Sequence, residues 1–377
     1  MNKFKFVFAS DSFKGSLSNE TINRILTASA RSVFGDCECV PLSVADGGEG
    51  TLQSLTRILG GEIRTLEVCG PLFEKVEASY GTAGDTAVIS MNEASGLTLV
   101  PEKERNPLYT TTYGTGELIL NAIKNGFKKI TVTLGGSATN DGGIGALTAL
   151  GYKFIKKDGS TARGVGEELA DITDVDFSGV TDLRDVKLTV LCDVVNPLTG
   201  SNGATYVFGR QKGADDNCLG ILESGMKNFA GIIKKTTGVD VQAIAGGGAA
   251  GGLGAALKVF LGGEMKSGIN ALLDAVNFDE RIRGATCVIT GEGRLDFQSA
   301  DGKVVSGVIN RAKKQKIPVI AICGSLGSGA EKVYGAGLVS AFSIIDRPSD
   351  LSGILGRSED LYRQTADNVF RTIKAFL

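Results

Sequence analysis

The chain has 377 residues, of which 42% are hydrophobic and 22% are charged, and its formal net charge is −2. This length and balance predict about two folded domains and exclude an intrinsically disordered chain. A chain with a net charge this close to zero has no strong electrostatic attraction for a nucleic acid or an anionic membrane, so we expect neither as a partner. No signal peptide and no apolar run of membrane length stands out, and we therefore expect a cytoplasmic protein.

Three residue counts restrict the chemistry. The chain contains no histidine, which excludes Ser-His-Asp hydrolysis, histidine-ligated metals and a histidine general base. A general base must be a carboxylate, a lysine or a thiolate, with a carboxylate as the default. The seven cysteines form no CxxC pair, which disfavours a structural zinc site. The 53 glycines are about twice the usual ~7% share and gather in clusters typical of tight turns beside a ligand.

The N-terminal segment is typical of two strand–helix units. A short apolar strand precedes a polar turn and a helix that Ser18 caps and Gly35 ends. A second strand, a glycine-rich acidic turn and a second helix follow. In chain order, these elements are expected at 4–9, 10–16, 18–35, 39–44, 45–50 and 52–59.

The rest of the chain contains further strands and helices. Residues 76–80 and 86–91 alternate in polarity around a glycine-rich turn, which predicts a β-hairpin. Short apolar strands followed by polar turns are expected at 130–134 and 188–191. The C-terminal part predicts strands at 286–290, 318–323 and 339–345, and helices at 303–314 and 358–376.

Both ends of the chain look like pieces of one parallel sheet. We therefore predict an α/β fold with two α/β domains. A discontinuous Rossmann-like parallel-sheet domain, residues 1–65 and 285–377, would carry a second α/β domain, residues 66–284, as an insertion. Two consecutive domains are the alternative.

Polar clusters follow four strands of the end segments, at 11–14, 46–49, 292–296 and 324–327. Ligands of open parallel sheets bind at the carboxyl ends of strands, so these clusters predict a site. The alternative for any one cluster is a helix cap, but four clusters at equivalent positions favour a site. Lys14 suits a phosphate, a substrate carboxylate or a loop salt bridge.

The other charged groups in these clusters also have two interpretations. Asp46 and Glu49 suit a magnesium ion or a base, or else a capped helix start. Arg294 suits a clamp on a carboxylate or a phosphoryl group. Asp296 or Glu292 suits the acceptance of a hydroxyl proton or the binding of Mg²⁺. The alternative for this last cluster is a buried ion pair.

Glycine-rich turns also occur in the middle segment. The turn at 135–143 follows a strand, and its small residues let backbone N–H groups approach an anion at a helix N-terminus. The run at 245–254 contains G-x-G-x-x-G, but a weak preceding strand and no acidic partner about 20 residues later argue against a dinucleotide site. Close helix packing explains those glycines about as well. Asp193 and Asn196 are further oxygen donors. Together these groups indicate a phosphate-handling enzyme.

Taken in order, these motifs resemble the type-1 glycerate kinase family. The matching stretches lie at 11–14, 45–51, 113–118, 135–143, 192–194, 196–198, 208–214, 249–257 and 291–296, with Gly302 and Lys303. The resemblance implies ATP-dependent phosphorylation of D-glycerate with Mg²⁺, giving 2-phospho-D-glycerate and ADP. It implies two α/β domains, one of them discontinuous. D-glycerate and ATP are the implied small-molecule partners, and a homo-oligomer is compatible with it.

The resemblance also suggests roles for single residues. We expect glycerate beside Asp11, Ser12, Lys14, Arg294 and Lys303, with a cation on its carboxylate. The expected catalytic residues are Asp296, Asp193, Arg294 and Lys14, with Asp296 or Asp193 orienting or deprotonating the attacking hydroxyl. The candidate Mg²⁺ ligands are Asp46, Glu49 and Asp193. The residues expected at the ATP phosphates are Gly135, Gly136, Ser137, Thr139, Asn140, Asp141, Gly247, Gly248 and Gly251.

Two other functions stay open at this point. A NAD-dependent hydroxyacid dehydrogenase would use the glycines at 246–251, and NADH binding would favour it. A non-catalytic sensor of an acidic metabolite would release no ADP with any acid. The sequence does not separate substrate-binding from metal-binding carboxylates.

Overall fold

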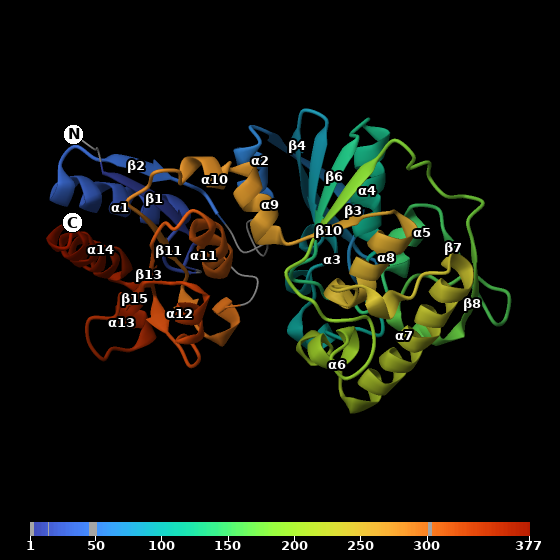
Figure 1. The fold of residues 1–377 in the computed structure, drawn as a ribbon. Coiled ribbons are helices and arrows are strands. Elements are labelled where there is room, and N and C mark those ends of the chain that lie inside the picture. The colour runs from blue at the N-terminus through green and yellow to red at the C-terminus, as the bar shows by residue number, and fades with distance from the viewer. Residues whose placement is uncertain (1–3, 14, 45–50, 301–303) are drawn as a thin grey trace. The chain divides into compact units, whose positions relative to one another are not determined.

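The computed structural model describes residues 4–13, 15–44, 51–300 and 304–377. By its internal contacts the chain forms two compact units. The first unit comprises Met1–Asp46 and Ile269–Leu377, and the second comprises Gly47–Gly268. Each unit contains a sheet with parallel strands covered by helices (Figure 1), so the predicted α/β class is confirmed.

The first unit is built on a five-stranded parallel sheet in the order β15-β13-β11-β1-β2. Its strands are β1 (Lys5–Ser10), β2 (Glu38–Pro41), β11 (Cys287–Gly291), β13 (Val319–Cys323) and β15 (Ser340–Ser343). The central strands β1, β11 and β13 are apolar and buried along nearly their whole length. This is the pattern expected of a parallel sheet with both faces covered.

Helices cover both faces of this sheet. The helices of the unit are α1 (Asn19–Phe34), α9 (Gly268–Ala275), α10 (Phe278–Arg281), α11 (Val304–Lys314), α12 (Lys332–Ala336), α13 (Leu351–Leu355) and α14 (Ser358–Ala375). Helices α1 and α14 pack together on the side of Phe6 and Phe8, where Ile25 and Phe370 complete one hydrophobic cluster. Helix α11 contacts β11 and β1 and contributes nothing to that cluster, which places it on the other face.

The second unit is built on a six-stranded sheet in the order β10-β9-β6-β5-β4-β3. Its strands are β3 (Glu62–Cys69), β4 (Lys75–Ala83), β5 (Thr86–Ser90), β6 (Lys129–Thr133), β9 (Lys187–Leu191) and β10 (Glu264–Lys266). The four strands from β5 to β10 are parallel, whereas β3, β4 and β5 form an antiparallel meander. A separate antiparallel pair consists of β7 (Lys153–Lys156) and β8 (Ile172–Asp176).

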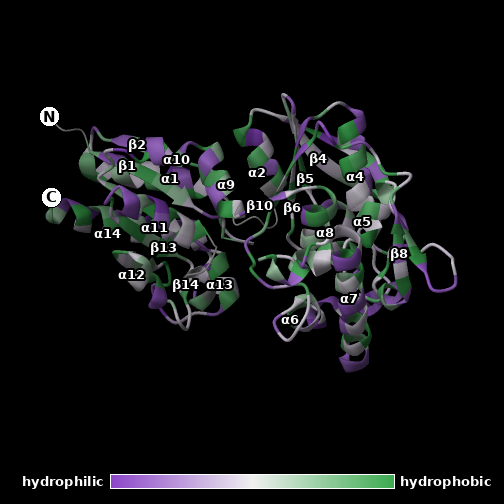
Figure 2. Cartoon of the chain, turned by 45° about the vertical axis from the view of Figure 1, so that its right-hand side comes forward, coloured by the Kyte–Doolittle hydropathy of each residue, from purple (hydrophilic) through white to green (hydrophobic). Residues whose placement is uncertain are grey.

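The helices of the second unit are α2 (Thr51–Ile58), α3 (Asn92–Ser95), α4 (Tyr113–Lys124), α5 (Ile144–Ala149), α6 (Ala204–Phe208), α7 (Asp216–Thr237) and α8 (Leu253–Phe260). Most of them share one large core with its sheet, to which α2 and α6 contribute no described residue. Figure 2 shows both hydrophilic and hydrophobic colours along α7 and α14, as expected of helices that bury one face. Among the described helices, none combines the length and apolar character needed to cross a bilayer.

Several local predictions are confirmed. The Ser18 side chain accepts a hydrogen bond from the N–H of Thr21 at the start of α1, and Gly35 ends the helix with a positive φ of 68°. The hairpin around the turn at 84–85 is β4–β5, with Ala83 opposite Thr86. The predicted division into domains at 65/66 and 284/285 concerns segments that fold independently, and it stays a prediction.

Candidate functional site

A cavity of about 410 Å³ opens at the carboxyl edge of the sheet in the first unit. Its polar wall comes from the turns that follow β1, β11 and β13, which are neighbours in the sheet. The polar side chains on this wall are Asp11, Ser12, Ser16, Glu292, Arg294, Asp296 and Ser325. Three clusters that are far apart in sequence therefore meet at one edge, as parallel topology requires.

A short parallel pairing fixes the turns after β11 and β13. In it, β12 (Arg294–Leu295) pairs with β14 (Ser325–Leu326), and the N–H of Ser325 bonds the carbonyl of Gly293 at 3.0 Å. Leu295 is fully buried. Successive side chains of a strand point to opposite sides. Because Leu295 points into the core, its neighbours Arg294 and Asp296 point away from the core and line the cavity.

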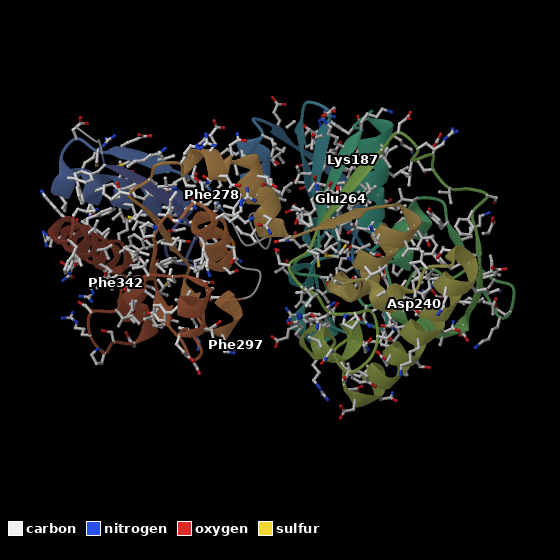
Figure 3. All side chains as sticks on the ribbon, in the orientation of Figure 1. Lys187, Asp240, Glu264, Phe278, Phe297 and Phe342 are labelled. Atoms are coloured by element: carbon white, nitrogen blue, oxygen red, sulfur yellow. The ribbon has the colours of Figure 1, made fainter. Side chains whose placement is uncertain are left out.

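Arg294 and Asp296 form an ion pair in which Nε and Oδ2 are 3.7 Å apart. The arginine side chain is 68% exposed and the aspartate side chain 18%. The pair is therefore not the buried one considered as an alternative, and its attraction is partly screened by water. An exposed guanidinium beside a shielded carboxylate leaves the cation accessible to an anionic ligand. Phe297, labelled in Figure 3, follows directly and is exposed.

Asp11 occupies the turn after β1. Its side chain is largely buried, and its Oδ1 accepts a hydrogen bond from the N–H of Ser12 at 2.7 Å. The Asp11 N–H in turn bonds the carbonyl of Gly291 on β11, at 2.8 Å. Asp11 thus joins the turns of two neighbouring strands and brings Ser12 to the cavity wall.

This cavity is also lined by apolar side chains. They are Phe13, Ile344, Ile345, Leu351, Ile354 and Leu355, the last three from α13. The sequence predicts no helix at α13, and the short run of apolar residues there gives no signal for a ligand. Four predicted site residues, Lys14, Asp46, Glu49 and Lys303, lie outside the described residues.

A second cavity, of about 390 Å³, lies in the second unit. Its lining includes Gly135, Gly136 and Ser137 from the turn after β6, and Ala249 and Ala250 from the other glycine-rich run. Lys187 and Glu264, labelled in Figure 3, mark the amino ends of β9 and β10. The cavity therefore lies at the carboxyl edge of this sheet as well, where β6 ends.

The glycines of the run at 245–254 are buried by packing against other turns. A Cβ atom on Gly251 would lie 2.1 Å from the carbonyl oxygen of Thr139, and one on Gly248 would lie 2.2 Å from that of Pro197. The N–H of Gly142 also bonds the carbonyl of Gly251 at 2.9 Å. Close packing thus explains Gly248 and Gly251. A Cβ on Gly247 would lie 3.1 Å from the carbonyl oxygen of Ile244, a less severe contact.

Asp141 holds the turn after β6 together. Its Oδ2 accepts from the N–H and the hydroxyl of Thr112, at 2.8 and 2.7 Å, and from the N–H of Gly145 at 3.3 Å. Its Oδ1 accepts from the N–H of Gly143 at 3.0 Å. Burial raises the pKa of this carboxyl, and the four donors oppose that rise. These contacts favour a role in shaping the turn.

The remaining predicted nucleotide residues also lie inside the turn. Thr139 and Asn140 are fully buried, and the Asn140 amide donates to Thr205 Oγ1 at 3.1 Å. Of the nine residues predicted at the phosphates, those that line the cavity are Gly135, Gly136 and Ser137. The other six do not line it: Thr139, Asn140 and Asp141 lie within the turn after β6, and Gly247, Gly248 and Gly251 belong to the run at 245–254.

Asp193 follows β9 and anchors the segment after β10. Its Oδ1 accepts from the Ser267 hydroxyl at 2.9 Å and from the Gly268 N–H at 2.8 Å. A Cβ on Gly268 would approach Asp193 Oδ2 to 2.6 Å, so a side chain at this position would displace the Asp193 carboxylate. Within the described part of the chain, no group of three or more acidic or cysteine side chains is placed to hold a metal ion.

One residue that lines the second cavity is not among the site residues predicted from the sequence. Lys212, in the 3₁₀ turn Arg210–Lys212, is 2% exposed and lines the cavity. Its ammonium donates to the carbonyl oxygen of Thr139 at 2.7 Å. Its place in the motif at 208–214 was the available signal, but a lysine between polar residues looks exposed in sequence.

Comparison with known proteins identifies the family. Residues 6–374 match the glycerate kinase family. A glycerate 2-kinase of Escherichia coli (strain K12) is 45% identical over 370 residues, covering 97% of this chain and 95% of that protein. A glycerate kinase of Bacillus cereus is 46% identical over 368 residues, covering 97% of each chain.

A solved structure agrees with these matches. A crystal structure from Salmonella typhimurium LT2, described as a candidate glycerate kinase 2, has a TM-score of 0.86 and 42% identity, covering 99% of both chains. The dehydrogenase and sensor alternatives gain no support from these comparisons. The chain therefore belongs to the glycerate kinase family and is a phosphotransferase enzyme.

Proposed function

We propose that this enzyme transfers the γ-phosphoryl group of ATP to D-glycerate, giving 2-phospho-D-glycerate and ADP. The observation that carries the acceptor assignment is the pairing of an exposed Arg294 with a shielded Asp296 on the wall of one cavity. A hydroxy acid offers this pair a carboxylate for the cation and a hydroxyl for the carboxylate. Names of relatives at 45% and 46% identity support the reaction class.

The chemical roles follow from this arrangement. Arg294 would bind the carboxylate of glycerate through charge-assisted hydrogen bonds. Asp296 would accept the proton of the 2-hydroxyl as its oxygen forms a bond to the γ-phosphorus and the bond to the bridging oxygen of ADP breaks. Asp193 is the second candidate for the base, but it already accepts hydrogen bonds from Ser267 and Gly268.

The nucleotide phosphates are proposed to lie at the second cavity, beside Gly135, Gly136 and Ser137. Of the three candidate Mg²⁺ ligands, Asp193 is the one among the described residues. Kinase sites hold Mg²⁺ with one or two carboxylates plus substrate phosphates, so a cluster of three is not required. When bound, the ion neutralises charge on the phosphoryl oxygens. We also propose a cytoplasmic location.

The test is a coupled assay of ADP release with MgATP and D-glycerate. Asp296→Asn should lower kcat by at least about 100-fold with little change in KM, because it removes a proton acceptor. Asp360→Asn, at the exposed start of α14, is the matched control and should leave turnover unchanged. Full turnover by folded Asp296→Asn would refute the base assignment, and no turnover by wild type would refute the kinase proposal.

A further inference from the structure

Lys212 is an unusual lysine, because it lies almost entirely inside the second unit. Its exposure is 2%, while the motif around it contains the exposed residues Arg210 and Gln211. Transfer of an ammonium group from water into a protein interior costs several kcal/mol unless partners compensate it. Burial of Lys212 therefore lowers the stability of the fold. One hydrogen bond to a backbone carbonyl stabilises the fold by less than this desolvation cost.

The hydrogen bonds of Lys212 are incomplete. An ammonium group has three hydrogens to donate. Among the described residues, its one hydrogen-bond acceptor is the carbonyl oxygen of Thr139, at 2.7 Å. The carboxylate of Asp141 attracts it electrostatically, but that group is already engaged by Thr112, Gly143 and Gly145. Two donors are therefore left for another acceptor.

The adjacent cavity has the character of an anion site. Lys212 is the one charged residue among the described residues that line it, so no carboxylate there competes for a bound anion. The glycine turn after β6 supplies the neighbouring wall through Gly135, Gly136 and Ser137. Small residues in such a turn let backbone N–H groups approach phosphate oxygens. In the same turn, the buried hydroxyl of Thr139 has no hydrogen-bond partner among the described residues.

We infer that Lys212 is a phosphate-binding residue of this cavity, whose ammonium donates to a phosphoryl oxygen of the bound nucleotide. The inference rests on the proposed function for the identity of the anion. To the proposed nucleotide site it adds Lys212, the one buried cation among the described residues beside the glycine turn after β6. Burial lowers the pKa of Lys212 to about 7, opposed by Asp141. A bound phosphate would restore the charged form, because an opposite charge at contact favours the protonated amine.

The experiment measures the binding of ADP and of adenosine by calorimetry, without glycerate, to wild type, Lys212→Met and Lys212→Arg. Loss of a charge-assisted hydrogen bond should weaken ADP binding by about 10- to 100-fold in Lys212→Met. Adenosine carries no phosphate, and its affinity should change less than about 2-fold. Lys212→Arg should recover part of the ADP affinity. Lys234→Met, which removes an exposed lysine paired with Asp240, controls for net charge.

The outcomes separate the two levels of the proposal. Equal ADP affinity in wild type and folded Lys212→Met, or equal losses for ADP and adenosine, would overturn the inference about Lys212 but not the proposed function, which the turnover of wild type tests. No nucleotide binding by wild type would instead refute the proposed function. If Lys212→Met does not fold, Lys212→Gln, which keeps a hydrogen-bond donor but no charge, takes its place in the same comparison. Unchanged ADP affinity in folded Lys212→Gln would contradict the inference.

Discussion

Replacement of Gly251 by alanine tests how the two glycine-rich turns of the second unit fit together. Gly251 has a positive φ of 64°, a left-handed conformation that L-residues with a side chain rarely adopt. The added Cβ would lie 2.1 Å from the Thr139 carbonyl oxygen and 2.6 Å from the Asn140 Cα. Both atoms belong to backbone that cannot rotate away, so one turn must move.

The expected cost follows from two effects. The left-handed conformation costs alanine about 1–2 kcal/mol relative to glycine, and overpacking of a close-packed interior costs about 1–3 kcal/mol. Gly251→Ala should therefore lower the free energy of unfolding by about 2–5 kcal/mol. For a unit of this size, that corresponds to a fall of roughly 5–15 °C in Tm.

The assay is thermal unfolding followed by calorimetry, with Gly231→Ala as the matched control. Gly231 lies on the exposed face of α7, and an added Cβ there meets nothing within 4 Å. Since alanine favours a helix over glycine by up to about 1 kcal/mol, the control should unfold no lower than wild type. A Gly251→Ala protein as stable as wild type would refute the packing explanation of this glycine.

Three further predictions concern single side chains. Asp141→Asn should lower the free energy of unfolding in urea by about 2–4 kcal/mol, because four donors lose an anionic acceptor; unchanged stability would contradict its structural role. Arg294→Met should have a free energy of unfolding within about 0.5 kcal/mol of wild type, since the arginine side chain of the ion pair is 68% exposed. Its kcat/KM for glycerate should fall at least about 10-fold. An unfolded variant would contradict this prediction. The pKa of Lys212 is about 7 in the folded state and near 10.4 in the unfolded state. Between these two pH values the unfolded state binds more protons, so the free energy of unfolding rises with pH. From pH 7 to 8, wild type should gain about 1 kcal/mol more than Lys212→Met; equal gains would contradict the lowered pKa.

Features set by local sequence could be predicted well. The Ser18 cap depends on residues within one helical turn, and the β4–β5 hairpin depends on its own turn. The meeting of Asp11, Glu292 and Asp296 could be predicted too, because carboxyl ends of neighbouring parallel strands share one edge.

Features that depend on individual side-chain packing between distant segments could not be predicted. The burial of Lys212 depends on Thr139, 73 positions earlier in the chain. Helix α7 was not assigned, because Gly220, Gly225 and Gly231 weaken its helical signal. The structure gives Gly225 a reason, since a Cβ there would lie 2.8 Å from the Leu169 Cβ. Likewise, α13 forms the apolar cavity wall only through tertiary packing.

Direct observation of the product tests the central claim most sharply. The enzyme is incubated with MgATP and D-glycerate, and the mixture is followed by phosphorus NMR with proton correlation. The account predicts stoichiometric ADP and a single phosphomonoester coupled to the proton on carbon 2. A 3-phosphate product would contradict the proposed regiochemistry, and ATP that stays intact with folded enzyme would contradict the account as a whole.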